Sequence, residues 1–229
     1  MQRIAKAVSS SGLCSRRNAE KLIAAGKVKV NGELIPTPAF LVDDQHIIEV
    51  SGKRINLPQQ PRMWIYYKPV GLITTHNDPE GRQTVFDNLP GLPRVISIGR
   101  LDINSEGLLL LTNNGELARK FELPSNRFER IYKVRARGNI IASMLKTTKQ
   151  DIKIDHIIYH IDSIKLLKSN KSNSWYEVIL HEGKNREIRK IFKYFGLEVN
   201  RLIRIKYGSY LLGDLKPSEY REVDLLVSK

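Results

Sequence analysis

A single aspartate, Asp102, lies between a β-branched segment and four consecutive leucines in the string SIGRLDINSEGLLLLTNNG, residues 97–115. Arg100 is two residues away, and a guanidinium near a carboxylate keeps that carboxylate ionised and lowers its pKa. An ionised carboxylate in a loop at a strand end is suited to nucleophilic or proton-abstracting chemistry. An isolated R-x-D is also a common structural ion pair, so both interpretations remain open at this point.

Two later segments contain further side chains that could act beside Asp102. Tyr132 lies in the strand-like stretch 131–136, where a tyrosine by itself is expected to fill the core. The string EGKNREIR, residues 182–189, begins a helix and supplies Lys184, Arg186 and Arg189. Cations at such a site could pair with a carboxylate or contact phosphates.

The N-terminal region carries a strongly one-sided charge. Residues 3–29 contain one acidic residue, Glu20, and seven basic ones: Arg3, Lys6, Arg16, Arg17, Lys21, Lys27 and Lys29. Arg16 and Arg17 fall at the start of an expected helix, where backbone N–H groups also favour phosphate. This pattern predicts a phosphate-binding platform, and the alternative is an ordinary solvated surface.

Composition narrows the class of protein. The chain has 229 residues, 38 Lys plus Arg against 24 Asp plus Glu, and a formal net charge of +14, which favours a nucleic-acid partner over a membrane surface. Cys14 is the sole cysteine, so an intramolecular disulfide and a Cys-rich zinc site are excluded. We expect no metal, because the five histidines are scattered. The N-terminus lacks a signal-peptide core, so we expect a cytoplasmic protein.

The first sixty residues predict a small domain of two helices and a short sheet. Ile4, Ala7 and Val8 follow helical spacing, Ser15 offers an N-cap for a second helix, and Gly26 ends it. Asn31-Gly32 predicts a type I′ hairpin turn. The segment SGKRINLPQQPR, residues 51–62, is typical of a linker, so we predict domains at 1–58 and 59–229.

Strands dominate the predicted second domain, with few helices between them. The expected strands are Trp64–Tyr67, Arg94–Ile98, Leu108–Thr112, Ile131–Ala136, Ile161–Leu167, Trp175–His181 and Arg201–Tyr207. The expected helices are Glu116–Phe121, Ile140–Thr147 and Glu187–Phe195. This order predicts an α+β fold around a mixed, largely antiparallel sheet with flanking helices.

Residues 15–32, SRRNAEKLIAAGKVKVNG, resemble the S4 RNA-binding domain pattern S-R-R-x-A-x-x-L-I-x-x-G-x-V-x-V-N-G. The resemblance extends over about the first fifty residues and implies binding to structured RNA. S4 domains are attached to several kinds of enzyme, so this part of the chain does not by itself name a reaction.

Residues 99–115 resemble motif II of the pseudouridine synthases, in particular the RsuA and RluB branch that acts on ribosomal RNA. Ser105 stands where threonine is common. The stretch YKPVG, residues 67–71, resembles the K-P-x-G motif with tyrosine in place of the frequent asparagine. RIYKV, residues 130–134, and EGKNREIR, residues 182–189, are similar to two further motifs of the family, in the expected order.

The resemblance implies a pseudouridine synthase fold and the cofactor-free isomerisation of a specific uridine in ribosomal RNA, reached by base flipping. It also implies roles for individual side chains. Asp102 would be catalytic, Tyr132 would pack on the uracil, Arg189 would pair with the aspartate, and Arg100 would belong to the same site. We expect RNA contacts from Arg3, Lys6, Arg16, Arg17, Lys27, Lys29, Lys68, Lys184 and Arg186.

Several points stay open in the sequence. Asp102 could attack the ribose C1′ or remove the C2′ proton, and the target uridine is not specified. We expect a monomer acting on ribosomal RNA or a pre-ribosomal subunit. The alternatives are a noncatalytic RNA-binding ribosome-assembly factor, an S4-linked methyltransferase and a DNA-binding regulator. The methyltransferase would require a glycine-rich cofactor loop after a strand, and the chain contains none.

Overall fold

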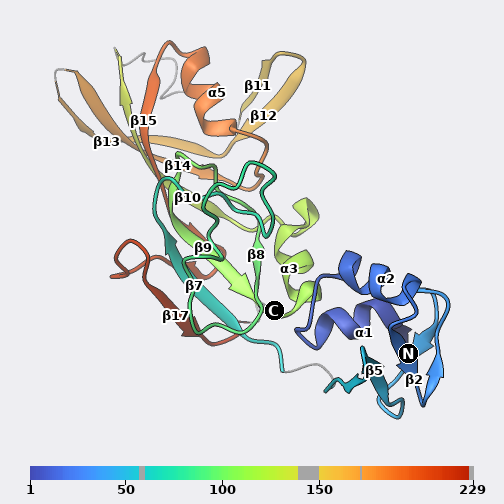
Figure 1. Cartoon of the computed structure of the whole chain (residues 1–229). Coiled ribbons are helices and arrows are strands. Elements are labelled where there is room, and N and C mark those ends of the chain that lie inside the picture. Colours follow the sequence, from blue (N-terminus) through green and yellow to red (C-terminus); the bar gives the residue numbers. More distant parts are fainter. Residues whose placement is uncertain (57–59, 139–149, 171, 227–229) are drawn as a thin grey trace. The chain divides into compact units, whose positions relative to one another are not determined.

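The computed structural model describes residues 1–56, 60–138, 150–170 and 172–226 (Figure 1). The chain divides into two compact units. The first contains Met1–Arg62 with Gly91–Ile96 and Thr112–Leu117, and the second contains Met63–Pro90, Ser97–Leu111 and Ala118–Lys229. The predicted boundary between residues 58 and 59 lies outside the described residues.

The first unit begins with two short helices, α1 (Ile4–Ser10) and α2 (Arg16–Ala24). Ser15 is the N-cap of α2, and its hydroxyl accepts a hydrogen bond of 3.2 Å from the Asn18 backbone N–H. Gly26 follows with a φ of 65°, the left-handed conformation that commonly ends a helix. The predicted cap residues are therefore confirmed.

Short strands complete this unit and enclose its core. β2 (Val28–Val30) pairs with β3 (Glu33–Leu34) and β5 (Ile48–Val50), β5 pairs with β6 (Lys53–Arg54), and β1 (Gln2–Arg3) pairs with β4 (Leu41–Val42). Asn31 and Gly32 both have positive φ, at 50° and 87°, as the predicted I′ turn requires. The core contains Ile4, Val8, Ala19, Ile23, Val28 and Ile48.

One sheet of nine strands accounts for most of the described second unit, in the order β13-β14-β10-β15-β9-β7-β17, with β16 beside β15 and β8 beside β9. The strands are β7 (Met63–Lys68), β8 (Ile96–Ile98), β9 (Glu106–Thr112), β10 (Arg130–Arg137), β13 (Ser163–Ser169), β14 (Asn173–Leu180), β15 (Glu198–Tyr207), β16 (Tyr210–Leu211) and β17 (Tyr220–Val223). The β9–β15 pair is parallel, whereas β10 is antiparallel to β14 and to β15.

β9 is the most deeply buried strand of this sheet, and its four leucines, 108–111, are inaccessible to solvent. Gly107 precedes them with a φ of 101°, and a Cβ at this position would lie 2.3 Å from the Arg204 backbone oxygen. Only glycine therefore fits where β9 meets β15. The leucine run is the buried strand beside the Asp102 loop that its composition predicted.

Helices and one hairpin flank the sheet. α5 (Glu187–Tyr194) packs its buried Ile188, Ile191 and Phe192 against β15, and the hairpin of β11 (Gln150–Ile154) and β12 (Ile157–Ile161) lies beside α5 (Figure 1). The hairpin was predicted only at its end, Ile161. The predicted helix Ile140–Thr147 lies outside the described residues.

The expected helix Glu116–Phe121 is present and extends one residue further at each end. The Asn114 Oδ1 accepts hydrogen bonds of 3.0 and 2.9 Å from the backbone N–H groups of Glu116 and Leu117, and so caps α3 (Gly115–Glu122). A short 3-10 turn, Pro124–Asn126, follows this helix. With few helices around a mixed sheet, the fold is α+β, as predicted. Among the described residues, no helix is long and apolar enough to cross a membrane.

Candidate active site

The loop between β8 and β9 carries Asp102, and its backbone is held at four carbonyl oxygens. The Thr74 hydroxyl donates to the Leu101 oxygen at 2.9 Å, and the Gly71 N–H donates to the Ile103 oxygen at 2.8 Å. The next two acceptors are the oxygens of Asn104 and Ser105, which receive bonds of 2.7 and 2.8 Å from Arg189 and Lys68. These four hydrogen bonds fix the position of the half-buried Asp102 before any substrate binds.

Lys68 lies inside the protein rather than on its surface. Its side chain is fully buried, and its Nζ donates to the backbone oxygens of Pro69 at 2.9 Å and Ser105 at 2.8 Å. Burial lowers the pKa of Lys68 to about 8, and the nearby Asp102 and Glu106 carboxylates oppose that shift. The prediction of an RNA contact for Lys68 is therefore wrong, because its ammonium is withdrawn into the loop that supports Asp102.

The expected pair between Arg189 and Asp102 is not a direct ion pair in this structure. Arg189 donates to the backbone oxygens of Asn104 at 2.7 Å and Val199 at 2.9 Å. Burial and the neighbouring Arg186 lower the pKa of Arg189, and the negative charge of Asp102 opposes this effect. Arg189 thus acts on Asp102 through the backbone and through its charge.

Arg100 makes no ion pair with Asp102, contrary to the structural alternative drawn from their spacing. Arg100 is exposed, and both residues line a cavity of about 790 Å³ in the second unit. No hydrogen bond or ion pair occupies the Asp102 carboxylate among the described residues. Its oxygens are therefore available to a bound molecule.

Tyr132 lies in the wall of the same cavity, in the middle of the sheet. It is on β10 opposite Arg204 of β15 and Val178 of β14, and only 7% of its surface is exposed. The cavity volume is typical of pockets that enclose a small molecule or a single nucleotide. The structure thus places the predicted Tyr132, Asp102 and Arg100 around one cavity.

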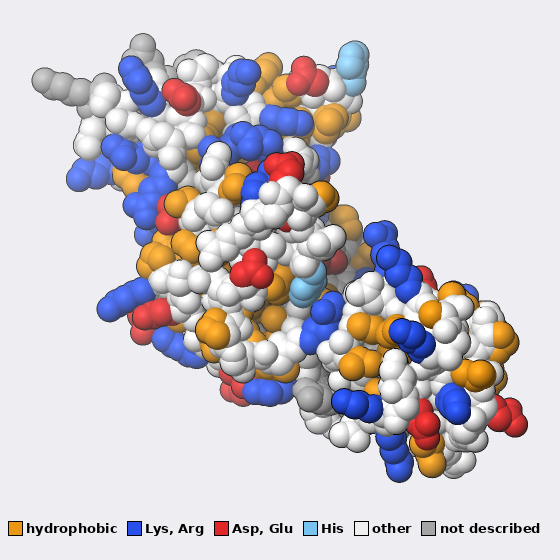
Figure 2. Space-filling model, in the orientation of Figure 1, with side chains coloured by type: hydrophobic (Ala, Val, Ile, Leu, Met, Phe, Trp, Pro, Cys, Tyr) orange, Lys and Arg blue, Asp and Glu red, His pale blue; other side chains and the backbone are white. Residues whose placement is uncertain are grey.

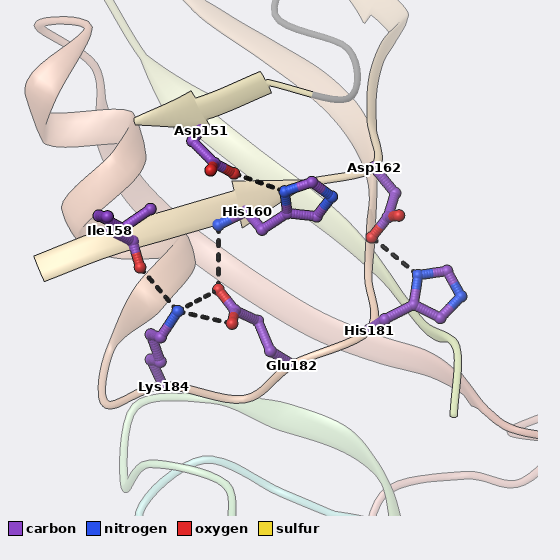
Figure 3. Close-up of polar contacts among 7 residues, drawn as sticks. All are labelled: Asp151, Ile158, His160, Asp162, His181, Glu182 and Lys184. Carbon is purple, nitrogen blue, oxygen red and sulfur yellow. Dashed lines mark hydrogen bonds and ion pairs between the residues drawn. The ribbon is translucent and has the colours of Figure 1, made fainter. Parts of the chain in front are cut away.

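The loop from Glu182 to Arg186 forms another side of the cavity. Figure 3 shows Lys184 reaching towards the β11–β12 hairpin, where its Nζ contacts both Glu182 carboxylate oxygens, at 2.6 and 2.7 Å, and the Ile158 backbone oxygen at 2.6 Å. The Glu182 carboxylate also accepts the His160 backbone N–H at 3.0 Å. Lys184 is therefore engaged with the protein before RNA arrives.

Arg186 and Glu187 follow at the start of α5, line the same cavity and differ in burial. Glu187 is buried, and burial raises its pKa to about 8 with a further contribution from the neighbouring Glu182 carboxylate. Arg186 is exposed, lines the cavity and has a left-handed φ of 51° at the N-cap of α5. That backbone conformation is costly for a residue other than glycine, and such strain is concentrated at functional sites.

The predicted RNA-binding residues of the N-terminal region all lie in the first unit. Those with exposed side chains are Arg3, Arg16, Arg17, Lys27 and Lys29. Lys6 is half-buried and pairs with Glu116 of the same unit. Arg16 lies 3.9 Å from Glu20, and both side chains are about half exposed. Figure 2 shows Lys and Arg side chains spread over the visible surface of this unit.

Two cavity residues, Arg130 and Arg204, were not predicted as site residues. Both are buried and line the cavity. The alternation of side chains along a strand could have identified both residues, because Arg130 falls on the same face as Tyr132 and Arg204 on the same face as Leu202. Among the described residues, no group of three His, Cys, Asp or Glu side chains is arranged to hold a metal ion.

Comparison with known proteins identifies the families to which the two parts of the chain are similar. Residues 62–194 match the family model described as RNA pseudouridylate synthase, and residues 2–48 match the S4 domain. An uncharacterized RNA pseudouridine synthase of Rickettsia felis is 64% identical over 224 residues, covering 98% of this chain and 97% of that protein.

More distant matches extend the comparison. The ribosomal large subunit pseudouridine synthase B of Haemophilus influenzae is 40% identical over 236 residues, covering 98% of this chain and 65% of that protein. A crystal structure of a pseudouridylate synthase has the same fold, with a TM-score of 0.67 and 22% identity over 98% of this chain and 96% of that one. The chain therefore belongs to the RNA pseudouridylate synthase family, as an enzyme with an N-terminal S4 domain.

Proposed function

We propose that this enzyme converts one uridine of large-subunit ribosomal RNA to pseudouridine, with Asp102 as the catalytic carboxylate. The observation that carries the proposal is the Asp102 side chain, which faces the cavity with no protein partner among the described residues while its loop is held by hydrogen bonds. The large-subunit substrate is supported by the 40% identity to the Haemophilus influenzae enzyme of that name.

The reaction is an isomerisation and consumes no second substrate. The bond from N1 of uracil to C1′ of the ribose breaks, the uracil turns, and C5 forms a new bond to C1′. The proton lost from C5 is balanced by the one gained at N1. A carboxylate acting on the ribose can start this sequence, and Asp102 is the cavity carboxylate available for that role.

The target nucleotide must leave its helix to reach Asp102, because a stacked and paired uridine hides its ribose and glycosidic bond. The cavity is large enough to receive one nucleotide. Tyr132 in the wall supplies an aromatic surface for the flipped uracil. Arg100 and Arg186 are exposed at the same cavity and would contact the flanking phosphates.

The first unit would hold the structured part of the RNA through its exposed cations. Its Arg16 and Arg17 lie in the first turn of α2, where the helix dipole adds to their attraction for phosphate. The proposed active species is a monomer.

Sequencing of ribosomal RNA for pseudouridine, with and without the gene, tests the function. We expect one uridine of the large-subunit RNA to remain unmodified in the deletion strain. The wild-type gene should restore the modification and Asp102→Asn should not. An unchanged pseudouridine map would contradict the proposal, and a lost site in small-subunit RNA would correct the substrate.

A further inference from the structure

Two arginines in the cavity wall contact the ring of one tyrosine, Tyr207. Arg130 begins β10 and Arg204 lies on the adjacent β15. Their Cζ atoms are 4.6 and 5.0 Å from the centre of the Tyr207 ring. The Arg130 Nη2 also donates to the Tyr207 hydroxyl at 2.8 Å, and the Arg204 Nε donates to the Leu108 backbone oxygen at 2.7 Å.

Both guanidinium groups are buried without a counter-ion. Arg130 is 7% exposed and Arg204 is 3% exposed, and no carboxylate of the described residues lies within 4.0 Å of either. One nitrogen of each group, Nη1 of Arg130 and Nη2 of Arg204, is buried with no hydrogen-bond acceptor among the described residues. Buried cations are costly unless they are paired, and the ring contacts offset only part of that cost.

The carboxylates that share the cavity do not neutralise these two cations. Asp78 is bound by Arg82, and Glu182 is bound by Lys184. Glu122 accepts the Gly99 N–H at 2.7 Å, and Glu187 accepts the Lys184 N–H at 3.0 Å. Asp102 lies close enough to Lys68 and Arg189 to affect their pKa values. The positive charge of Arg130 and Arg204 therefore remains available to an anion that enters the cavity.

Their place in the sheet puts this charge beside the position proposed above for the base of the substrate. Arg204 is directly opposite Tyr132 in the β10–β15 pair, and Arg130 precedes Tyr132 by two residues on the same face. Gly183 passes over Arg130, where a Cβ would lie 3.8 Å from its Cζ. A nucleotide stacked on Tyr132 would thus bring its sugar–phosphate backbone near both arginines.

We propose that Arg130 and Arg204 form a binding site for a phosphodiester of the RNA strand that carries the target uridine. The proposal rests on the proposed function, since it takes RNA as the substrate of this cavity. The phosphate supplies the missing acceptors and the missing negative charge together. Guanidinium groups suit this task because they donate several hydrogen bonds to phosphate oxygens.

Thermal unfolding of the full chain, at constant ionic strength set with sodium chloride, provides a direct test. The probes are uridine 5′-monophosphate, inorganic phosphate and uridine. A ligand that binds only the folded state raises the melting temperature, and the stabilisation grows with the logarithm of the ratio of ligand concentration to dissociation constant. We expect the two phosphate-bearing probes, and not uridine, to stabilise the wild-type chain.

Glutamine variants of the two arginines show whether the stabilisation by phosphate-bearing probes arises at this site. Arg130→Gln and Arg204→Gln should weaken the apparent affinity for uridine 5′-monophosphate about tenfold, the loss expected for one charge-assisted hydrogen bond. Arg135→Gln is the matched control, because Arg135 is an exposed arginine of the same strand that does not line the cavity. It should respond like the wild type. Anion binding at the basic first unit is the same in all variants and cancels in this comparison.

Two outcomes would contradict the proposed phosphate-binding site, whatever the stability of the variants. One is a wild-type chain that phosphate-bearing probes stabilise no more than uridine does, and the other is an equal response in all variants. If the glutamine variants do not fold, Arg130→Lys and Arg204→Lys keep a cation in place. They should then retain a weakened but measurable phosphate response, and a full loss in folded lysine variants would count against the site.

Binding to ribosomal RNA fragments separates RNA phosphate from a free anion. The affinity should fall about tenfold in the two cavity variants and stay unchanged in Arg135→Gln. A lost phosphate response with unchanged RNA affinity would overturn the phosphodiester assignment in favour of a free anion. Since none of these measurements reads pseudouridine, an unaltered pseudouridine map would count against the proposed function alone.

Discussion

Arg189 donates a hydrogen bond of 2.7 Å from its Nη2 to the backbone oxygen of Asn104, two residues beyond Asp102. A second bond, from Nη1 to the Val199 oxygen at 2.9 Å, fixes the guanidinium against β15. One side chain of α5 therefore ties the loop of the candidate catalytic residue to the sheet. We propose that its contribution to the reaction is positional, because it contacts the Asp102 loop through the backbone.

Arg189→Lys tests this positional role. Lysine keeps the positive charge but cannot serve both carbonyls in a fixed geometry. We expect turnover to fall about 100-fold, the order of loss that follows a displacement of about 1 Å at an active site. Affinity for ribosomal RNA should stay near the wild-type value in a filter-binding assay. Lys193→Gln, which removes an exposed cation of the same helix, is the control and should turn over normally.

Asp102→Asn preserves the size of the side chain and removes its charge. Because the proposed chemistry requires a carboxylate, we expect pseudouridine formation to fall by a factor on the order of 10⁴. RNA affinity should be largely spared, since phosphate contacts come from other residues. Single-turnover kinetics on an RNA fragment with the target uridine would measure both quantities. Retained turnover would remove Asp102 from the mechanism.

The double variant Arg16→Gln with Arg17→Gln tests the phosphate-binding platform of the first unit. Each lost phosphate contact should reduce the slope of log affinity against log salt by about one. The matched control is Lys53→Gln with Arg54→Gln, which makes the same charge change on the exposed β6 at an edge of the small sheet. An equal change of slope in both pairs would indicate general electrostatic attraction rather than a platform on α2.

Glu187→Gln should alter how stability depends on pH. The folded state raises the pKa of Glu187 to about 8, so between its ordinary value of 4.5 and 8 the folded chain binds more protons than the unfolded chain. This carboxyl therefore contributes stability that is fully present below pH 4.5 and lost as pH rises through 8. Urea unfolding from pH 5 to 9 should show a smaller decline for the glutamine variant. An identical decline would show that Glu187 does not titrate in this range.

Gly107→Ala should destabilise the second unit strongly. The new methyl group would lie 2.3 Å from the Arg204 backbone oxygen and 2.8 Å from its nitrogen, and the residue has a φ of 101°. Backbone atoms in a central strand cannot move aside, so we expect a loss of about 4 kcal/mol or more in the free energy of unfolding. Gly213→Ala, at a φ of 61° in open space, is the control and should cost about 1 to 2 kcal/mol.

Local patterns in the sequence predicted most elements, because caps, turns and strand alternation act over a few residues. Ser15, Gly26 and Asn31-Gly32 were interpreted correctly as an N-cap, a helix end and a hairpin turn. The expected helix Glu116–Phe121 is α3, and Asn114 caps its first turn.

The sequence alone was sufficient to identify the family and the α+β class, and to propose the residues that carry chemistry, since these reside in residue types and short spacings. Tertiary structure decided which charges meet. Lys68 is drawn inside by two backbone oxygens, Arg100 and Asp102 do not pair, and Arg189 acts through Asn104. Arg130 and Arg204 converge on one ring only because β10 and β15 are neighbours in the sheet. Such contacts depend on strand pairing across 74 positions of the chain, which local pattern does not encode.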